Sequence, residues 1–173
     1  IKPGDIIKSG LGKTIEVTNT DAEGRLILAD ALGYSHKLKP SLIIDMATLT
    51  GLADKITDNK ASIILGNNNK VLNKLIDIGD DINDKVINMP IWRDFIDNTK
   101  SDIADYKNLD LSTNGGSTIY AGAFLSNFVP PKTDWVHIDL GGSYTTSSRY
   151  YNKQGCTGIG VNLVINYIEQ LSY

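Results

Sequence analysis

The chain has 173 residues, which is enough for one domain with a substantial hydrophobic core. Hydrophobic residues make up 41% and charged residues 21% of it, close to globular averages, and this composition argues against a disordered chain. The net charge of −3, with both signs interspersed, gives no indication of a nucleic-acid or anionic-membrane partner.

The few cysteines and histidines restrict the chemistry further. Cys156 is the single cysteine and cannot form an internal disulfide, which predicts a reducing, cytoplasmic location. Two histidines are too few for a His-rich zinc site, so any metal site must be built largely from oxygen ligands. No apolar run has transmembrane length, and there is no secretory signal pattern. The chain begins at Ile1 rather than Met, and we expect it to be part of a longer protein.

Hydrophobic periodicity predicts helices that alternate with short buried strands. Strands are predicted at residues 13–17, 41–46, 61–65 and 135–140. Helices are predicted at residues 22–38, 71–79, just after Pro90, 117–129 and 157–171. This alternation predicts an α/β sandwich with a largely parallel sheet. Functional sites in such sheets lie beyond the carboxyl ends of the strands.

Residues 19–26, with the sequence NTDAEGRL, are the most informative segment. Thr20 and Glu23 fit a helix capping box, and this purely structural interpretation is the first one to consider. Arg25 argues against it, because a cation in the first helical turn opposes the helix dipole by a few tenths of a kcal/mol. Gly24 costs roughly 1 kcal/mol relative to alanine there. The segment therefore accepts local costs, as functional segments do.

The octapeptide resembles the signature of the leucine aminopeptidase (cytosol aminopeptidase) family, and the similarity continues along almost the whole chain. The further matching motifs, in the family's order, are residues 45–51 (D-x-A-T-L-T-G), 101–108 (S-D-x-A-D-x-K-N), 135–142 (W-x-H-x-D-x-x-G) and 155–160 (G-x-T-G-x-G). The resemblance implies a three-layer α/β/α sandwich with a mixed, largely parallel sheet. Residues 1–173 would be the C-terminal part of its catalytic domain.

The resemblance also implies a function, the release of N-terminal amino acids from peptides by a water that two divalent metal ions activate. Zinc or manganese would be the metal. Asp21 and Glu23 would be metal ligands, with Glu23 the bridge, and Arg25 would hold a catalytic bicarbonate. The implied substrate-binding residues are Asn19, Thr48, Leu49, Gly51 and Gly141. Family members are cytoplasmic hexamers, which predicts a homo-oligomer.

Two carboxylates cannot complete the coordination of two divalent ions, each of which takes about four to eight ligands. In the family, a lysine, two aspartates and a catalytic lysine precede the segment that begins here, so we expect this chain alone to be inactive. Asp45 and Asp139, each at a predicted strand end, are the acids best placed to substitute. The alternative for both is a hydrogen-bonded structural carboxylate, and it is the favoured one.

Departures from the family pattern leave other functions open. Gly141 stands where the family commonly has alanine near the pocket for the first side chain, and Tyr144 just beyond could narrow that pocket. The missing ligands and the polar stretch at residues 52–59 allow an inactive scaffold or assembly protein that keeps the fold. Some family members also bind DNA, but the acidic balance of this chain does not favour that role.

Overall fold

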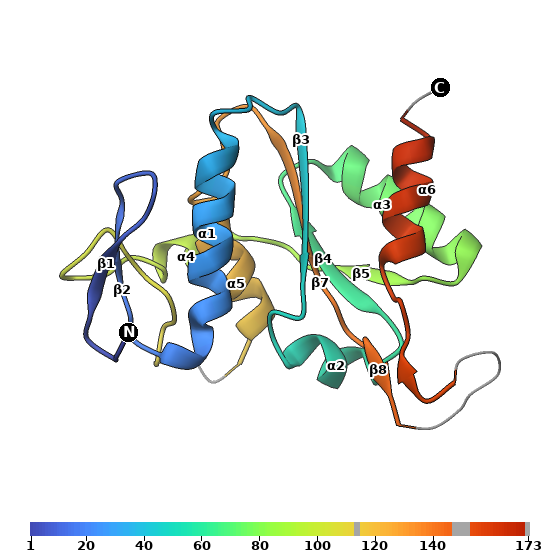
Figure 1. The fold of residues 1–173 in the computed structure, drawn as a ribbon, viewed down its shortest axis with the longest axis horizontal. Helices are drawn as coiled ribbons and strands as arrows, with labels where there is room; N and C mark the ends of the chain where they lie inside the picture. Colours follow the sequence, from blue (N-terminus) through green and yellow to red (C-terminus); the bar gives the residue numbers. More distant parts are fainter. Residues whose placement is uncertain (113–114, 147–152, 172–173) are drawn as a thin grey trace. The chain divides into compact units, whose positions relative to one another are not determined.

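The computed structural model describes residues 1–112, 115–146 and 153–171. The chain forms two compact units, each built from two separate segments of the sequence. Figure 1 colours the chain from its N-terminus to its C-terminus. Unit 1 comprises Ile1–Ile43 and Pro90–Trp135, and unit 2 comprises Ile44–Met89 and Val136–Tyr173.

Unit 1 combines a small sheet with helices. Strand β1 (Ile6–Lys8) pairs antiparallel with β2 (Thr14–Glu16), and β2 pairs parallel with β6 (Tyr106–Lys107). A 3-10 turn, η1 (Thr20–Ala22), leads from β2 into α1 (Glu23–Ser35). Helix α5 (Ser117–Ser126) packs against both α1 and α4 (Arg93–Asp97), and Figure 1 shows α1 and α5 alongside each other. Phe124, Leu125 and Phe128 are fully buried at the centre of this unit.

Unit 2 is built on a sheet with the strand order β3-β7-β4-β5. Its strands are β3 (Leu42–Ala47), β7 (Asp134–Asp139), β4 (Ser62–Gly66) and β5 (Val86–Asn88); β3 and β7 both begin in unit 1. Strand β4 pairs parallel with β5 and antiparallel with β7. Helix α2 (Leu52–Thr57) packs on β4, and α3 (Asn69–Ile82) packs on α6 (Val161–Glu169). Strand β8 (Tyr144–Thr145) pairs antiparallel with β9 (Gly155–Cys156).

Helix α3 corresponds to the helix predicted at residues 71–79, and its caps and buried face explain why the sequence predicts it. Asn68 caps its first turn by accepting a hydrogen bond from the Lys70 N–H at 2.9 Å, and Asn83 ends it in the left-handed conformation. The buried face is Val71, Leu72, Leu75, Ile78 and Gly79. Ile76, on the same helix, is only half-buried.

The predicted α/β class with a mixed sheet is confirmed, and every predicted strand and helix is present. Element ends were less accurate, since α1 stops at Ser35 and not Leu38, and α6 begins at Val161 and not Thr157. Strands β1, β5, β6, β8 and β9 and helix α2 were not predicted. Among the described residues, no helix is long and apolar enough to cross a membrane.

Candidate functional site

The turn that contains the carboxylates is capped by Asn19 and not by Thr20. The Asn19 side-chain oxygen accepts a hydrogen bond from the Asp21 N–H at 2.8 Å and begins η1. Ala22 occupies the N-cap of α1, which has no side-chain cap bond, so the capping box expected between Thr20 and Glu23 does not form. Asp21 and Glu23 both lie exposed at this helix start. The purely structural interpretation of the octapeptide is therefore wrong in its main contact.

Arg25 lies inside unit 1 and is only 4% exposed. Its Nη1 donates to the Asn108 carbonyl at 2.7 Å, and its Nη2 donates to the Ser117 carbonyl at 3.3 Å. These carbonyl oxygens supply negative partial charge to a guanidinium that would otherwise be costly to bury. The cation in the first turn of α1 is therefore stabilised by a carbonyl directly after β6 and by one at the start of α5.

A second cluster lies in unit 2, where Asp139 at the end of β7 holds the loop that follows β3. Asp139 is fully buried, and its Oδ1 accepts hydrogen bonds from the N–H groups of Leu49 and Thr50, both at 3.0 Å. Its Oδ2 accepts from the Thr50 hydroxyl at 2.6 Å. The N–H of Leu49 is thus directed to Asp139, which leaves its carbonyl as the main-chain group that could meet a ligand. Thr48 and Gly51 beside it are exposed.

Gly141 is buried because the backbone of unit 2 approaches it closely. An added Cβ would lie 2.5 Å from the Ala61 carbonyl oxygen and 3.2 Å from the Ala53 carbonyl carbon. The alanine that the family resemblance suggests at this position would therefore collide with backbone rather than line a pocket. The neighbouring Gly142 has φ +72° and donates its N–H to Asp54 Oδ1 at 2.6 Å. Tyr144 lies exposed on β8.

Asp45 and Asp139 act as structural carboxylates, as the favoured alternative predicted. Asp45 Oδ1 lies 2.5 Å from Nδ1 of His137, a fully buried side chain on β7. Within residues 1–112, 115–146 and 153–171, no group of three or more His, Cys, Asp or Glu side chains is arranged to hold a metal ion. Asp21 and Glu23, both exposed, therefore have no third such side chain grouped with them in the described part of the chain.

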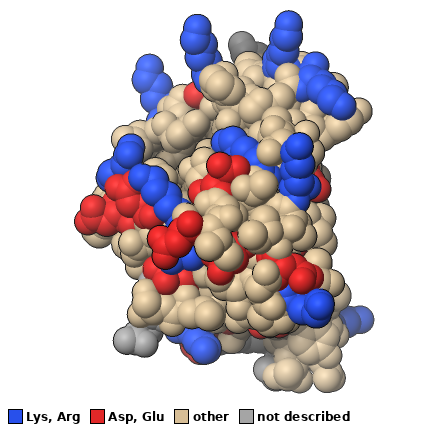
Figure 2. All heavy atoms as spheres, turned by 90° about the vertical axis from the view of Figure 1, so that its left-hand side faces the viewer, with Lys and Arg blue, Asp and Glu red and all other residues tan. Residues whose placement is uncertain are grey.

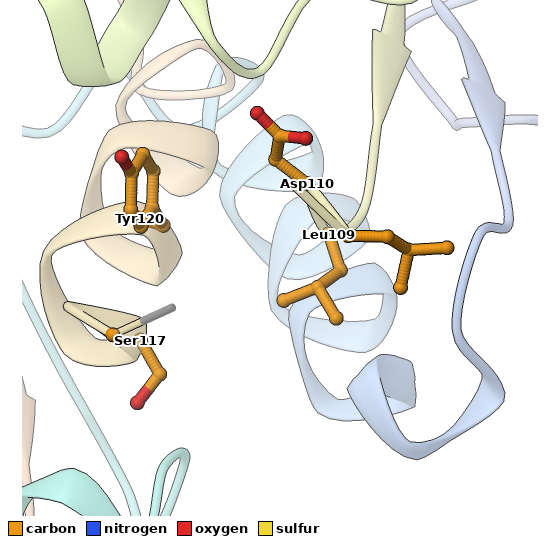
Figure 3. A pocket seen from close by; sticks show the side chains of 6 residues that line it. Leu109, Asp110, Ser117 and Tyr120 are labelled. Carbon is orange, nitrogen blue, oxygen red and sulfur yellow. The ribbon is translucent and has the colours of Figure 1, made fainter. Parts of the chain in front are cut away.

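A cavity of about 200 Å³ in unit 1 was not anticipated from the sequence. Figure 3 shows Ser117 and Tyr120 of α5 across from Leu109 and Asp110, and the remaining lining residues are Leu111 and Gly115. Burial raises the pKa of Asp110, but hydrogen bonds from the Ser112 N–H and hydroxyl, at 3.1 and 2.8 Å, and Lys107 at 3.3 Å lower it overall. The cavity is therefore mainly apolar, with one ionised carboxylate at its edge.

The predicted site residues are distributed over both units. Asn19, Asp21, Glu23 and Arg25 belong to unit 1, and Thr48, Leu49, Gly51 and Gly141 belong to unit 2. The sequence alone assigned no role to Asn108. Its side chain nevertheless accepts a hydrogen bond from the Thr18 N–H and donates one to the Asn19 carbonyl, at the start of the segment that contains Asp21 and Glu23. The signal available for it was the S-D-x-A-D-x-K-N motif, which Asn108 ends.

Surface charge bears on the nucleic-acid role, which the acidic balance of the sequence does not favour. Figure 2 shows Lys and Arg side chains beside Asp and Glu side chains on the face that it presents. Because phosphate binding depends on a basic patch or stripe, this face provides no support for that role.

Comparisons with known proteins agree with the motifs. Residues 1–165 match the catalytic domain of the cytosol aminopeptidase family. The chain is 44% identical over 170 residues to a probable cytosol aminopeptidase of Geobacter sp. (strain M21), covering 98% of this chain and 34% of that protein. It is 43% identical over 175 residues to one from Protochlamydia amoebophila (strain UWE25), covering 99% and 34%. The chain thus spans about a third of the length of these relatives.

A solved structure shows the same fold. The bottromycin maturation enzyme BotP in complex with Mn superposes with a TM-score of 0.92 at 28% sequence identity, covering 99% of this chain and 38% of that one. This structural likeness agrees with the match over residues 1–165 and with the order of the sequence motifs. The chain belongs to the cytosol aminopeptidase family, whose catalytic domain residues 1–165 match.

Proposed function

We propose that this chain carries part of the site of a metal-dependent aminopeptidase, which releases N-terminal amino acids from peptides. The observation that carries the proposal is the pair of exposed carboxylates, Asp21 and Glu23, which precede Arg25 by four and two residues in the chain. The Arg25 guanidinium itself is held by a main-chain carbonyl. Among the described residues, neither carboxylate is hydrogen-bonded or ion-paired through its side chain. Two such carboxylates within one turn suit a divalent cation, whose ligands are commonly oxygen atoms.

In this proposal, Asp21 and Glu23 would supply carboxylate oxygen ligands to divalent ions. Two divalent ions, when bound, would polarise the scissile carbonyl and lower the pKa of a water molecule. Manganese or zinc fits these donors, and the Mn in the BotP complex supports manganese. Arg25, held by the carbonyls of Asn108 and Ser117, would orient a planar oxyanion such as bicarbonate, which accepts the proton from water.

Unit 2 supplies main-chain groups suited to a peptide. Because Asp139 takes the N–H of Leu49, the Leu49 carbonyl is the group that would accept a hydrogen bond from a substrate N–H. Thr48 and Gly51 flank this carbonyl on the exposed loop. For unit 1 by itself, Asn19 is the residue that we propose for contact with a peptide backbone. Gly141 allows the backbone at Ala61 to approach closely, because the side chain of any larger residue would collide with the Ala61 carbonyl oxygen.

The ligand count limits what this chain can do alone. Asp21 and Glu23 cannot supply the roughly four or more ligands that each ion requires. We infer that the remaining ligands are not among the described residues, and that residues 1–173 by themselves bind metal weakly and have no peptidase activity. The family hexamer and a cytoplasmic location remain predictions for the protein to which this chain corresponds.

Calorimetry with Mn²⁺ and Zn²⁺ on the 173-residue chain tests the proposal. We expect weak binding that Asp21→Ala and Glu23→Ala each abolish, whereas Asp77→Ala, which removes an exposed carboxylate on α3, changes nothing. Binding that survives both substitutions would contradict the assignment of these two residues. Tight binding of two ions would instead contradict the inference that ligands are missing.

The second candidate is an inactive scaffold that retains the aminopeptidase fold. The specific observation in its favour is the absence, over the part of the chain that the structure describes, of any cluster of three metal-ligating side chains. It predicts no change in heat or in thermal stability with either metal at millimolar concentration. A metal-dependent rise in the unfolding temperature that requires Asp21 and Glu23 would exclude it.

A further inference from the structure

We propose that Asn108 is a positioning residue for the carboxylate segment, residues 19–25. Its side chain and main chain hold this segment so that Asp21, Glu23 and Arg25 keep one relative arrangement. The inference rests on the proposed function only for the role of that arrangement, which is to bind metal. The contacts themselves are independent of any metal.

The side chain of Asn108 is fully buried, and all of its polar groups are used. Its Oδ1 accepts hydrogen bonds from the Thr18 N–H at 2.9 Å, the Thr18 hydroxyl at 3.0 Å and the Asn19 N–H at 3.3 Å. Its Nδ2 donates to the carbonyls of Asn19 at 2.7 Å and Ala22 at 3.3 Å. One amide thus binds both the entry to η1 and its last residue, which fixes the turn that presents Asp21.

The main chain of Asn108 adds two further contacts. Its N–H donates to the Glu16 carbonyl at 3.0 Å, next to the end of β2. Its carbonyl accepts from Arg25 Nη1 at 2.7 Å. The residue therefore connects the strand before the segment, the turn within it and the guanidinium at its end. Only a side chain with both an acceptor and two donors at this length can serve the turn on both sides.

The rest of the S-D-x-A-D-x-K-N motif aligns Asn108 with β2. The Ser101 hydroxyl donates to Glu16 Oε2 at 2.5 Å. Asp105 Oδ2 accepts from the Thr14 N–H and hydroxyl at 2.7 and 2.8 Å, and the Asp105 N–H donates back to the Thr14 hydroxyl at 3.0 Å. These bonds flank the parallel pairing of Ile15 with Tyr106, so the motif sets the register that delivers Asn108 to the segment.

Two substitutions separate geometry from charge. Asn108→Ala removes every side-chain contact. Asn108→Asp keeps the size and the acceptor but loses both donors, and it adds a negative charge that alone would tighten cation binding. The matched control is Asn127→Asp, which loses Nδ2 bonds to Thr99 and to the Ala123 and Phe124 carbonyls in the same unit. None of these bonds reaches residues 19–25.

Two measurements on the full 173-residue chain test the proposal. The first is amide hydrogen exchange at Thr18 and Asn19, and the second is Mn²⁺ titration followed by paramagnetic broadening of the Ala22 and Gly24 amide signals. We expect Asn108→Ala to speed exchange at Thr18 and Asn19 by roughly tenfold, since a buried bond is lost. Both Asn108 variants should weaken Mn²⁺ binding by roughly tenfold, and Asn127→Asp should stay within about twofold.

Each outcome decides a separate point. Tighter Mn²⁺ binding by Asn108→Asp together with unchanged binding by Asn108→Ala would overturn positioning in favour of simple charge. Unchanged exchange at Thr18 and Asn19 in Asn108→Ala would also overturn it. If the unsubstituted chain shows no Mn²⁺ broadening at all, the proposed function fails for this chain, and the exchange measurement alone decides positioning. Should Asn108→Ala not fold, the proposal is judged on Asn108→Asp, for which Mn²⁺ binding equal to or tighter than that of the unsubstituted chain overturns it.

Discussion

Replacing Asp139 by alanine should disorder the loop after β3 and destabilise the chain. The substitution removes a fully buried acceptor of three hydrogen bonds, two from main-chain N–H groups and one from the Thr50 hydroxyl. Bonds to a charged acceptor contribute about 1.5–3 kcal/mol each. Since Leu49 and Thr50 are only half-buried, water can replace some of the lost hydrogen bonds. We therefore expect the free energy of unfolding to fall by about 3–5 kcal/mol.

Urea denaturation followed by circular dichroism measures this loss, and amide hydrogen exchange locates it at Leu49 and Thr50. For a chain of this length, the loss corresponds to a fall in melting temperature of roughly 6–20 °C. Asp139→Asn keeps an oxygen acceptor for both N–H groups and should cost only about 1 kcal/mol. Asp77→Ala, an exposed substitution on α3, should stay within about 0.5 kcal/mol. A loss below about 1 kcal/mol for Asp139→Ala would show that the loop does not depend on this carboxylate.

Three further substitutions test other contacts. Gly141→Ala places a methyl group 2.5 Å from the Ala61 carbonyl oxygen, so the free energy of unfolding in urea should fall by about 1–3 kcal/mol, and an unchanged midpoint would contradict the close approach. Arg25→Lys cannot bridge two carbonyls with a planar fork and should cost about 1–2 kcal/mol by the same assay, whereas a neutral result would remove the structural role of the guanidinium. Hydrogen bonds from the Thr14 N–H and hydroxyl lower the pKa of Asp105, so its contribution to stability is present above the unfolded value and is lost as the pH falls through the folded one. Asp105→Asn should therefore make stability fall less between pH 5 and pH 2, and an identical acid profile would refute this.

Sequence patterns predicted those parts of the fold that local physics determines. Helix α3 was readable because its apolar positions recur at helical spacing between two asparagine caps. Strands β1 and β5 are three residues long and largely exposed, so no alternating pattern distinguishes them, and partner strands stabilise them. The cap at Asn19 was missed because Thr20 and Glu23 satisfy the same local rule one residue later.

The residue types of the candidate site were predictable from the sequence, but the long-range hydrogen bonds and backbone contacts that hold these residues in place were not. Asp21, Glu23 and Arg25 stand together in the sequence, and the family motif named them. Asn108 lies 89 residues beyond Asn19, and a single sequence gives no signal that the two are bonded. Similarly, the collision that excludes a side chain at Gly141 arises from the backbone of Ala61, eighty residues earlier in the chain.

The tight fit around Gly141 also makes the effect of a substitution there depend on residues elsewhere in the chain. A methyl group at this position meets the carbonyl oxygen of Ala61 and the carbonyl carbon of Ala53, and backbone atoms cannot move aside as a flexible side chain would. An exchange of glycine for alanine here should therefore depend on helix α2, which carries Ala53, and on the segment just before β4, which carries Ala61. Substitutions that move either segment outward should make the alanine tolerable, whereas in the present backbone it collides.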